Sequence, residues 1–259
     1  MIITWLFMEV KNILCSIIRA DYVSKKVNTM KFLKETALDQ VKRIAEAFLL
    51  LPIKETNLSP LFIQHPFFDS PFTCTNGSIV NFMDNEETYK RVLVTYRKKI
   101  AGCDSLFDVF VLLRKPYRLA FLKHVCEYMS RKDFSVFLKE IWIESENPNQ
   151  DPNVPTSMLV RWFRQSDKHY LMSEHEYKLY QELPDYFKVY RGVSPGREHN
   201  GLSWTASYEV ADWFRKRFET KAKQGYVREG YIHKSDVLAI FEDRNESEVV
   251  IDVRKLIEL

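Results

Sequence analysis

The 259-residue sequence has few cysteines, few glycines before residue 190 and little net charge. None of its four cysteines has a partner at CxxC spacing, and the distances between them match no zinc pattern. The six histidines form no metal-ligand spacing such as HExxH. We therefore expect free thiols in a reducing compartment, a cytoplasmic protein and no bound metal.

The sequence also lacks a strong excess of one charge and long apolar runs. The 38 basic and 35 acidic side chains leave a net charge of +3, too weak to predict a nucleic acid or an anionic membrane as partner. Glu9, Lys11 and Arg19 interrupt the apolar residues 1–20, so no run reaches the roughly 18–20 residues of a membrane span. The first charge is acidic, unlike that of a secretory signal. We expect an amphipathic helix packed on the protein body, with a membrane-surface helix as the alternative.

The distribution of glycine divides the sequence. Only two glycines precede residue 190, and the other five of the seven fall within the next forty positions. Because glycine serves tight turns and close backbone approaches, we predict helices first and a sheet with tight loops afterwards. The predicted fold class is α+β, with a mostly helical domain of unknown role over residues 1–150. A polar loop with three prolines, residues 144–155, leads into a second domain over residues 155–259.

Apolar periodicity indicates the helices of the first domain. Apolar side chains at three-and-four spacing predict helices over residues 31–51 and 105–129, the second with a kink at Pro116. Asp84 is the expected cap of a further helix that runs to Ile100.

Helix and strand signals alternate after residue 170. Ser173 and Glu176 form a capping box that opens a helix. Residues 187–193 alternate and are rich in β-formers, so they predict a strand. Residues 206–219 predict an amphipathic helix. The aromatic residues expected on its buried face are Trp213, Phe214 and Phe218.

Three short motifs follow one another in this C-terminal part. They are Tyr190, Arg191 and Gly192 on a predicted strand, Ser203, Trp204 and Thr205 before a predicted helix, and Glu246, Ser247 and Glu248 before an apolar strand. Each motif is common alone, but their order and spacing resemble the arginine–serine–glutamate class of ADP-ribosyltransferases, with a Glu-x-Glu pair. The resemblance covers roughly residues 155–259 and implies a split β-sheet core. The build is similar to that of phage or mobile-element proteins with an appended, toxin-like transferase domain.

The resemblance implies that NAD is bound as a substrate by the first two motifs. Arg191 would pair with the diphosphate, because guanidinium offers a planar fork of donors and keeps its charge. Gly192 would let the nicotinamide amide approach its backbone. The alternatives are a surface arginine in a salt bridge and an ordinary strand bulge.

The remaining motif residues would serve the chemistry. Ser203 would steer Glu248 by a hydrogen bond, and Thr205 would support the pocket. For both, the alternative is capping of the helix 206–219. Glu248 would stabilise the oxocarbenium-like state that forms as the nicotinamide–ribose bond breaks. Glu246 would accept a proton from the incoming nucleophile, and its alternative is a solvated loop acid.

The activity implied is mono-ADP-ribosyl transfer from NAD to a protein side chain, with release of nicotinamide. A glutamate at position 246 favours arginine as the acceptor. The sequence departs from the family pattern in two places: Trp-Thr-Ala follows Ser203, and no aromatic residue lies beside the two glutamates. These departures bear on the choice of acceptor more than on the NAD site. NAD hydrolysis and a non-catalytic protein-interaction module on the same fold are the alternatives, and the weak net charge does not favour nucleic acid as acceptor.

Overall fold

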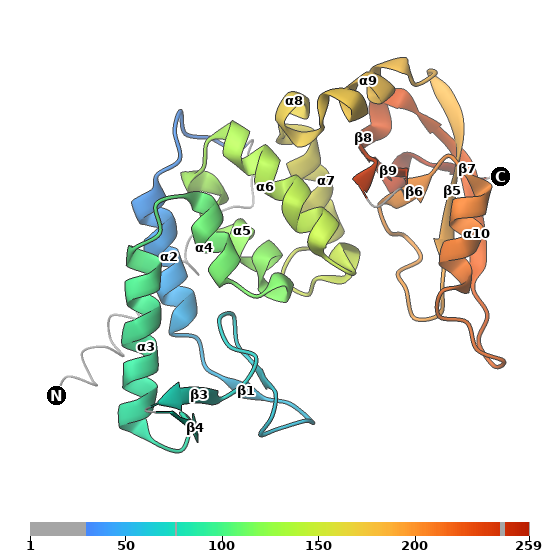
Figure 1. Ribbon diagram of the computed structural model, residues 1–259. Helices are drawn as coiled ribbons and strands as arrows, with labels where there is room; N and C mark the ends of the chain where they lie inside the picture. The colour runs from blue at the N-terminus through green and yellow to red at the C-terminus, as the bar shows by residue number, and fades with distance from the viewer. Residues whose placement is uncertain (1–29, 76, 244–246, 259) are drawn as a thin grey trace. The chain divides into compact units, whose positions relative to one another are not determined.

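The computed structural model describes residues 30–75, 77–243 and 247–258, and its chain is mixed helix and sheet, an α+β arrangement (Figure 1). The helix expected over residues 1–20 lies outside the described residues. The chain divides into two compact units, Met1–Ser130 and Arg131–Leu259, here called the N-terminal unit and the C-terminal unit. This division falls upstream of the loop 144–155, so the helix that follows Ser130 belongs with the C-terminal unit.

Helices and two small hairpins build the N-terminal unit. Its elements are α2 (Leu38–Leu49), β1 (Lys54–Glu55), β2 (Ile63–Gln64), β3 (Phe72–Thr75), β4 (Ser78–Asn81), α3 (Glu86–Ala101), α4 (Leu106–Leu112), η1 (Lys115–Tyr117), α5 (Arg118–Val125) and η2 (Cys126–Tyr128). Helix α2 packs against α3, α4 and α5. The ring of Phe121 meets Phe48 and Phe110 edge to face, each at a centroid distance of 5.2 Å. These apolar contacts make the core of the unit.

Local details differ from the sequence prediction where turns interrupt the helices. Asn85, not Asp84, caps α3, because its Oδ1 accepts a hydrogen bond from the Thr88 N–H at 3.0 Å. The single kinked helix predicted over residues 105–129 is wrong, since an extended residue, Leu113, separates α4 from the helices that follow. The hairpins were not predicted, because strands of two to four residues show no readable periodicity.

A buried histidine joins the hairpin region to α2. His65 is fully shielded from solvent and stacks on Phe68 at a centroid distance of 4.4 Å. Its Nδ1 accepts the Phe67 N–H at 3.2 Å, so Nε2 carries the proton donated to the Leu51 carbonyl oxygen at 3.1 Å. Burial lowers the pKa of His65 to about 4, although hydrogen bonds to the Leu51 and Leu49 carbonyls act to raise it.

This histidine predicts a loss of stability in mild acid. Below about pH 6.5 the unfolded chain binds a proton at His65 that the folded unit excludes until about pH 4, so stability falls as the pH drops through this window. The total effect is on the order of 3 kcal/mol. Urea unfolding of the full chain at several pH values checks it, with His65→Gln as the comparison. Equal pH dependence in the two proteins between pH 6.5 and 4 would contradict the prediction.

The C-terminal unit is a six-stranded sheet with helices packed on it. Its helices are α6 (Arg131–Glu144), α7 (Thr156–Gln165), α8 (Lys168–Leu171), α9 (Glu174–Glu182) and α10 (Tyr208–Lys216), with short turns η3 (Pro148–Gln150), η4 (Lys234–Asp236) and η6 (Val253–Lys255). Its strands are β5 (Tyr186–Val193), β6 (Ser203–Thr205), β7 (Tyr226–His233), β8 (Val237–Phe241), β9 (Glu248–Ile251) and β10 (Ile257–Glu258). The strand order is β10-β7-β5-β6-β9-β8, and every neighbouring pair is antiparallel.

Helices cover different parts of this sheet. Helix α10 packs along β5, whereas α7 and α9 contact β8 (Figure 1). The predicted capping box is confirmed, since Ser173 and Glu176 open α9, and the predicted strand 187–193 is β5. The prediction that Trp213 and Phe218 are core residues is wrong, because their exposed fractions are 57% and 45%. Helix α10 ends at Lys216, so the helical spacing does not extend to Phe218.

Candidate functional site

The sheet order brings the three predicted motifs together. Strands β5, β6 and β9 are consecutive neighbours, although a helix and two further strands separate β6 from β9 in the sequence. Arg191 lies on β5, Ser203 begins β6 and Glu248 begins β9. The fold thereby places one residue of each motif on one of three adjacent strands.

The register defines the neighbours of Glu248 on β6. Thr205 is paired with Glu248, and Ser203 is paired with Val250, two positions further along β9. Residues two apart on a strand face the same side, so Ser203, Thr205 and Glu248 share one face of the sheet. Diagonal neighbours of this kind lie roughly 7 Å apart, within reach of a glutamate side chain. The predicted steering of Glu248 by Ser203 remains a prediction.

The guanidinium of Arg191 is enclosed by backbone. Its Nη1 donates to the Ser203 carbonyl oxygen at 2.6 Å and its Nη2 to that of Glu198 at 2.9 Å. A side chain on Gly201 would meet Nη2 at 2.2 Å, so this glycine makes room for the guanidinium. The Nε atom is shielded and has no hydrogen-bond partner among the described residues. The alternative of a surface arginine in a salt bridge does not match this enclosure.

The electrostatics of Arg191 connect it to Glu248. Burial lowers the pKa of Arg191 to about 10, and the negative charge of Glu248 acts in the opposite direction. The positive charge of Arg228, paired with Arg191 across β5 and β7, adds to the lowering. Arg191 therefore stays charged at neutral pH, and Glu248 is one of the groups that compensate its burial.

Glu248 is held at the beginning of β9. The indole N–H of Trp142, on α6, donates to its Oε1 at 3.0 Å. Ser247, just before it, has a φ of 44°, in the left-handed region that non-glycine residues rarely adopt. Such a conformation costs on the order of 1–2 kcal/mol and is common at functional sites. Sequence reasoning missed Trp142, because no local pattern marks it.

Gly192 serves the packing of α10 in this structure. A Cβ atom there would lie 2.0 Å from the Ala211 carbonyl oxygen and 2.6 Å from the Arg215 nitrogen, both in α10. The pairing of β5 with β7 runs through Gly192 without a shift, so the expected alternative of a bulge is wrong. A contact between the Gly192 backbone and nicotinamide remains a prediction.

The second motif does not cap α10. Ser207 is the N-cap, since its hydroxyl accepts the Val210 N–H at 3.2 Å. The hydroxyl of Thr205 accepts the Ser207 N–H at 3.2 Å instead. The capping alternative for Ser203 and Thr205 is therefore wrong. Thr205 is buried beside Glu248, while Ser203 is half-buried.

Glu246 lies outside the described residues, but the chain on its N-terminal side is anchored. Lys139, on α6, forms ion pairs with Glu176 at 2.7 Å and Asp243 at 3.1 Å. Glu176 also accepts the backbone N–H of Glu242 at 3.0 Å. Burial opposes ionisation of both partners, yet these hydrogen bonds raise the pKa of Lys139 and lower that of Glu176. The pair is therefore ionised and fixes the end of β8.

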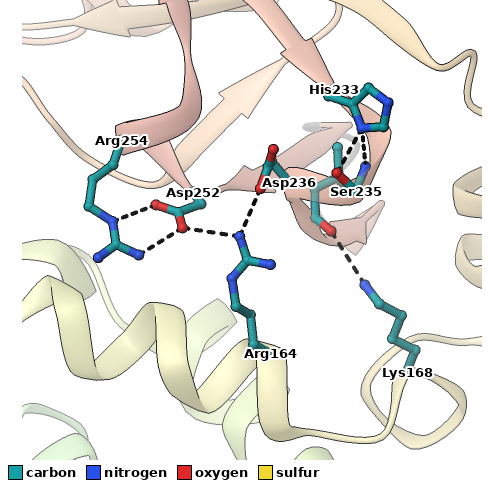
Figure 2. Close-up of polar contacts among 8 residues, drawn as sticks. Arg164, Lys168, His233, Ser235, Asp236, Asp252 and Arg254 are labelled. Carbon is teal, nitrogen blue, oxygen red and sulfur yellow. Dashed lines mark hydrogen bonds and ion pairs between the residues drawn. The ribbon is translucent and has the colours of Figure 1, made fainter. Parts of the chain in front are cut away.

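A second charged network ties α7 to the sheet, as Figure 2 shows. Arg164 donates to Asp236 at 2.9 Å and to the buried Asp252 at 3.1 Å, and Asp252 also binds Arg254 at 2.7 Å. Lys168 donates to the Leu238 carbonyl oxygen at 3.0 Å. Burial and the nearby Arg164 lower the pKa of Lys168 to about 8. Arg164 is paired with two carboxylates and Lys168 with a strand carbonyl oxygen, so we assign this network a structural role.

A cavity of about 360 Å³ lies between the start of α7 and the loop 194–202. Its polar lining includes Thr156, Ser157, Asn200 and Arg254. Glu198 also lines it and gives its carbonyl oxygen to Arg191, so the cavity borders the candidate site.

Comparisons with protein-family models, curated proteins and solved structures find no match for the chain. Within residues 30–75, 77–243 and 247–258, no cluster of histidine, cysteine, aspartate or glutamate could hold a metal ion. None of the helices in the described part of the chain is long and apolar enough to cross a membrane. The geometry of the C-terminal unit therefore carries the functional argument.

The packing at Gly192 predicts a destabilised variant. Gly192→Ala would force α10 away from β5 and should lower the free energy of unfolding by about 1–3 kcal/mol. Gly102→Ala is the control. A Cβ atom there would lie 3.2 Å from its nearest neighbour, a single carbonyl oxygen at the end of α3. Chemical denaturation of both variants checks the difference. Unchanged stability of Gly192→Ala would contradict the assigned packing.

Proposed function

We propose that the C-terminal unit is a NAD-dependent ADP-ribosyltransferase that moves ADP-ribose to a protein side chain. The observation that supports this most is the adjacency of β5, β6 and β9, which brings the strands that carry Arg191, Ser203 and Glu248 together from separate parts of the chain. Tyr190, paired with Thr205, shares the face of Glu248, and Arg191 contacts β6 through the Ser203 carbonyl oxygen. Arg191 and Glu248 are also close enough for the charge of one to affect the ionisation of the other. A cation for the diphosphate and an anion for the ribose are the two charges that NAD cleavage requires.

Glu248 would carry the bond-breaking step. As the bond between nicotinamide and ribose lengthens, positive charge grows on the ribose. A carboxylate held beside the 2′-hydroxyl stabilises that charge more than it stabilises intact NAD, and this difference lowers the barrier. The hydrogen bond from Trp142 and the pairing with β6 fix the position of Glu248. Nicotinamide leaves with the bonding electron pair.

Arg191 would bind the diphosphate, and Glu246 would act on the acceptor. A guanidinium has five N–H donors, and the two carbonyl contacts of Arg191 use only part of them. Glu246 would take the proton of the incoming nucleophile, with an arginine side chain as the favoured acceptor. With water as the acceptor, the same residues would hydrolyse NAD.

An assay with NAD labelled on its adenylate part and a cell lysate tests the proposal. The wild type is expected to release nicotinamide and to label protein. Glu248→Gln should slow NAD cleavage by roughly 10²–10³-fold, because the compensating negative charge is lost. Glu246→Gln should keep NAD cleavage but lose protein labelling. Glu229→Gln, an exposed glutamate on β7, is the matched control and should behave as wild type.

The outcomes separate the alternatives. A wild type that neither releases nicotinamide nor labels protein would refute the enzymatic proposal. Release without labelling would favour NAD hydrolysis over transfer. Equal activity of Glu248→Gln and Glu229→Gln would remove Glu248 from the catalytic step.

A further inference from the structure

Helix α6 holds the chain on both described sides of the β8–β9 connection. Lys139 pairs with Asp243, just after β8, and Trp142 bonds Glu248, at the start of β9. Residues three apart lie on the same face of a helix, so one face of α6 makes both contacts. This helix lies outside the segment 155–259 to which the transferase resemblance extends.

Aromatic packing fixes the indole of Trp142. The side chain is buried and meets the ring of Phe163, on α7, edge to face at a centroid distance of 5.0 Å. Phe163 in turn contacts Phe241 at 6.3 Å, and Phe241 is paired with Glu248 across β8 and β9. Two ring contacts and the β8–β9 backbone pairing therefore link Trp142 to Glu248 by a second route besides the hydrogen bond.

We propose that Trp142 is a positioning residue for Glu248, an inference that rests on the proposed function. An indole N–H only donates, so it can bind the carboxylate but cannot take over its chemistry. Binding Oε1 restricts rotation of the carboxylate, and the carboxylate so oriented would meet the ribose 2′-hydroxyl. The glutamate is thus oriented before NAD arrives, and little reorganisation is needed during the reaction.

Trp142→Phe tests this role, because phenylalanine keeps an aromatic ring against Phe163 and removes the N–H donor, and the loss of ring volume is matched in the control below. The expected result is a kcat for nicotinamide release about tenfold to a hundredfold lower, the range for a lost hydrogen bond to a charged group. The KM for NAD should stay near that of the wild type, whereas the unfolding midpoint should fall, because ring volume and a hydrogen bond to a charged group are lost. Trp162→Phe is the control, since Trp162 is equally buried on α7 and packs edge to face on Phe134.

A wild-type kcat in Trp142→Phe would overturn the proposal, and so would an equal fall in Trp162→Phe. The contact itself has a readout that needs no activity. In the folded protein, Glu248→Gln should shift the indole N–H resonance of Trp142 and leave that of Trp162 in place. An unmoved Trp142 resonance would refute the contact, whereas a wild type that releases no nicotinamide would refute the proposed function.

Discussion

The guanidinium of Arg191 is the charge around which the candidate site is organised. Removing a cation from water is costly, so the surrounding chain must compensate it. The carbonyl oxygens of Ser203 and Glu198 accept its hydrogen bonds, and Gly201 leaves the space it fills. Glu248 supplies negative charge from β9. One side chain thus sets the path of the loop 194–202, the start of β6 and the charge required on β9.

The position of Glu248 depends on a second group of contacts, which come from outside the motifs. Trp142 binds the carboxylate, and Lys139 with Glu176 fixes the end of β8. Both contacts start on α6, which lies in the C-terminal unit. In the proposed transferase, different contacts therefore hold the two residues. Backbone carbonyl oxygens bind Arg191, and a side chain of α6 binds Glu248.

Local sequence patterns predicted the elements that carry the site, and long-range contacts set the rest. The strand at 187–193 and the capping box at Ser173 follow from short-range rules, and both are present. The contact of Trp142 with Glu248 joins residues 106 positions apart, which no local pattern reveals. Likewise, the sequence predicts either a bulge or a ligand contact at Gly192, and its close packing against α10 is seen only in the structure. Trp213 follows helical spacing but faces solvent, because spacing does not say which side of α10 meets the sheet.

We propose that Arg191 on β5 and Glu248 on β9, the two strands on either side of β6, belong to one NAD site. Calorimetric titration of NAD into the wild type and Arg191→Lys tests it most directly. Lysine keeps the positive charge but lacks the planar fork that pairs with phosphate oxygens and with the two carbonyls. We expect the wild type to bind NAD and the variant, folded by circular dichroism, to bind it at least about tenfold more weakly. A wild type that does not bind NAD, or a variant of equal affinity, would contradict it.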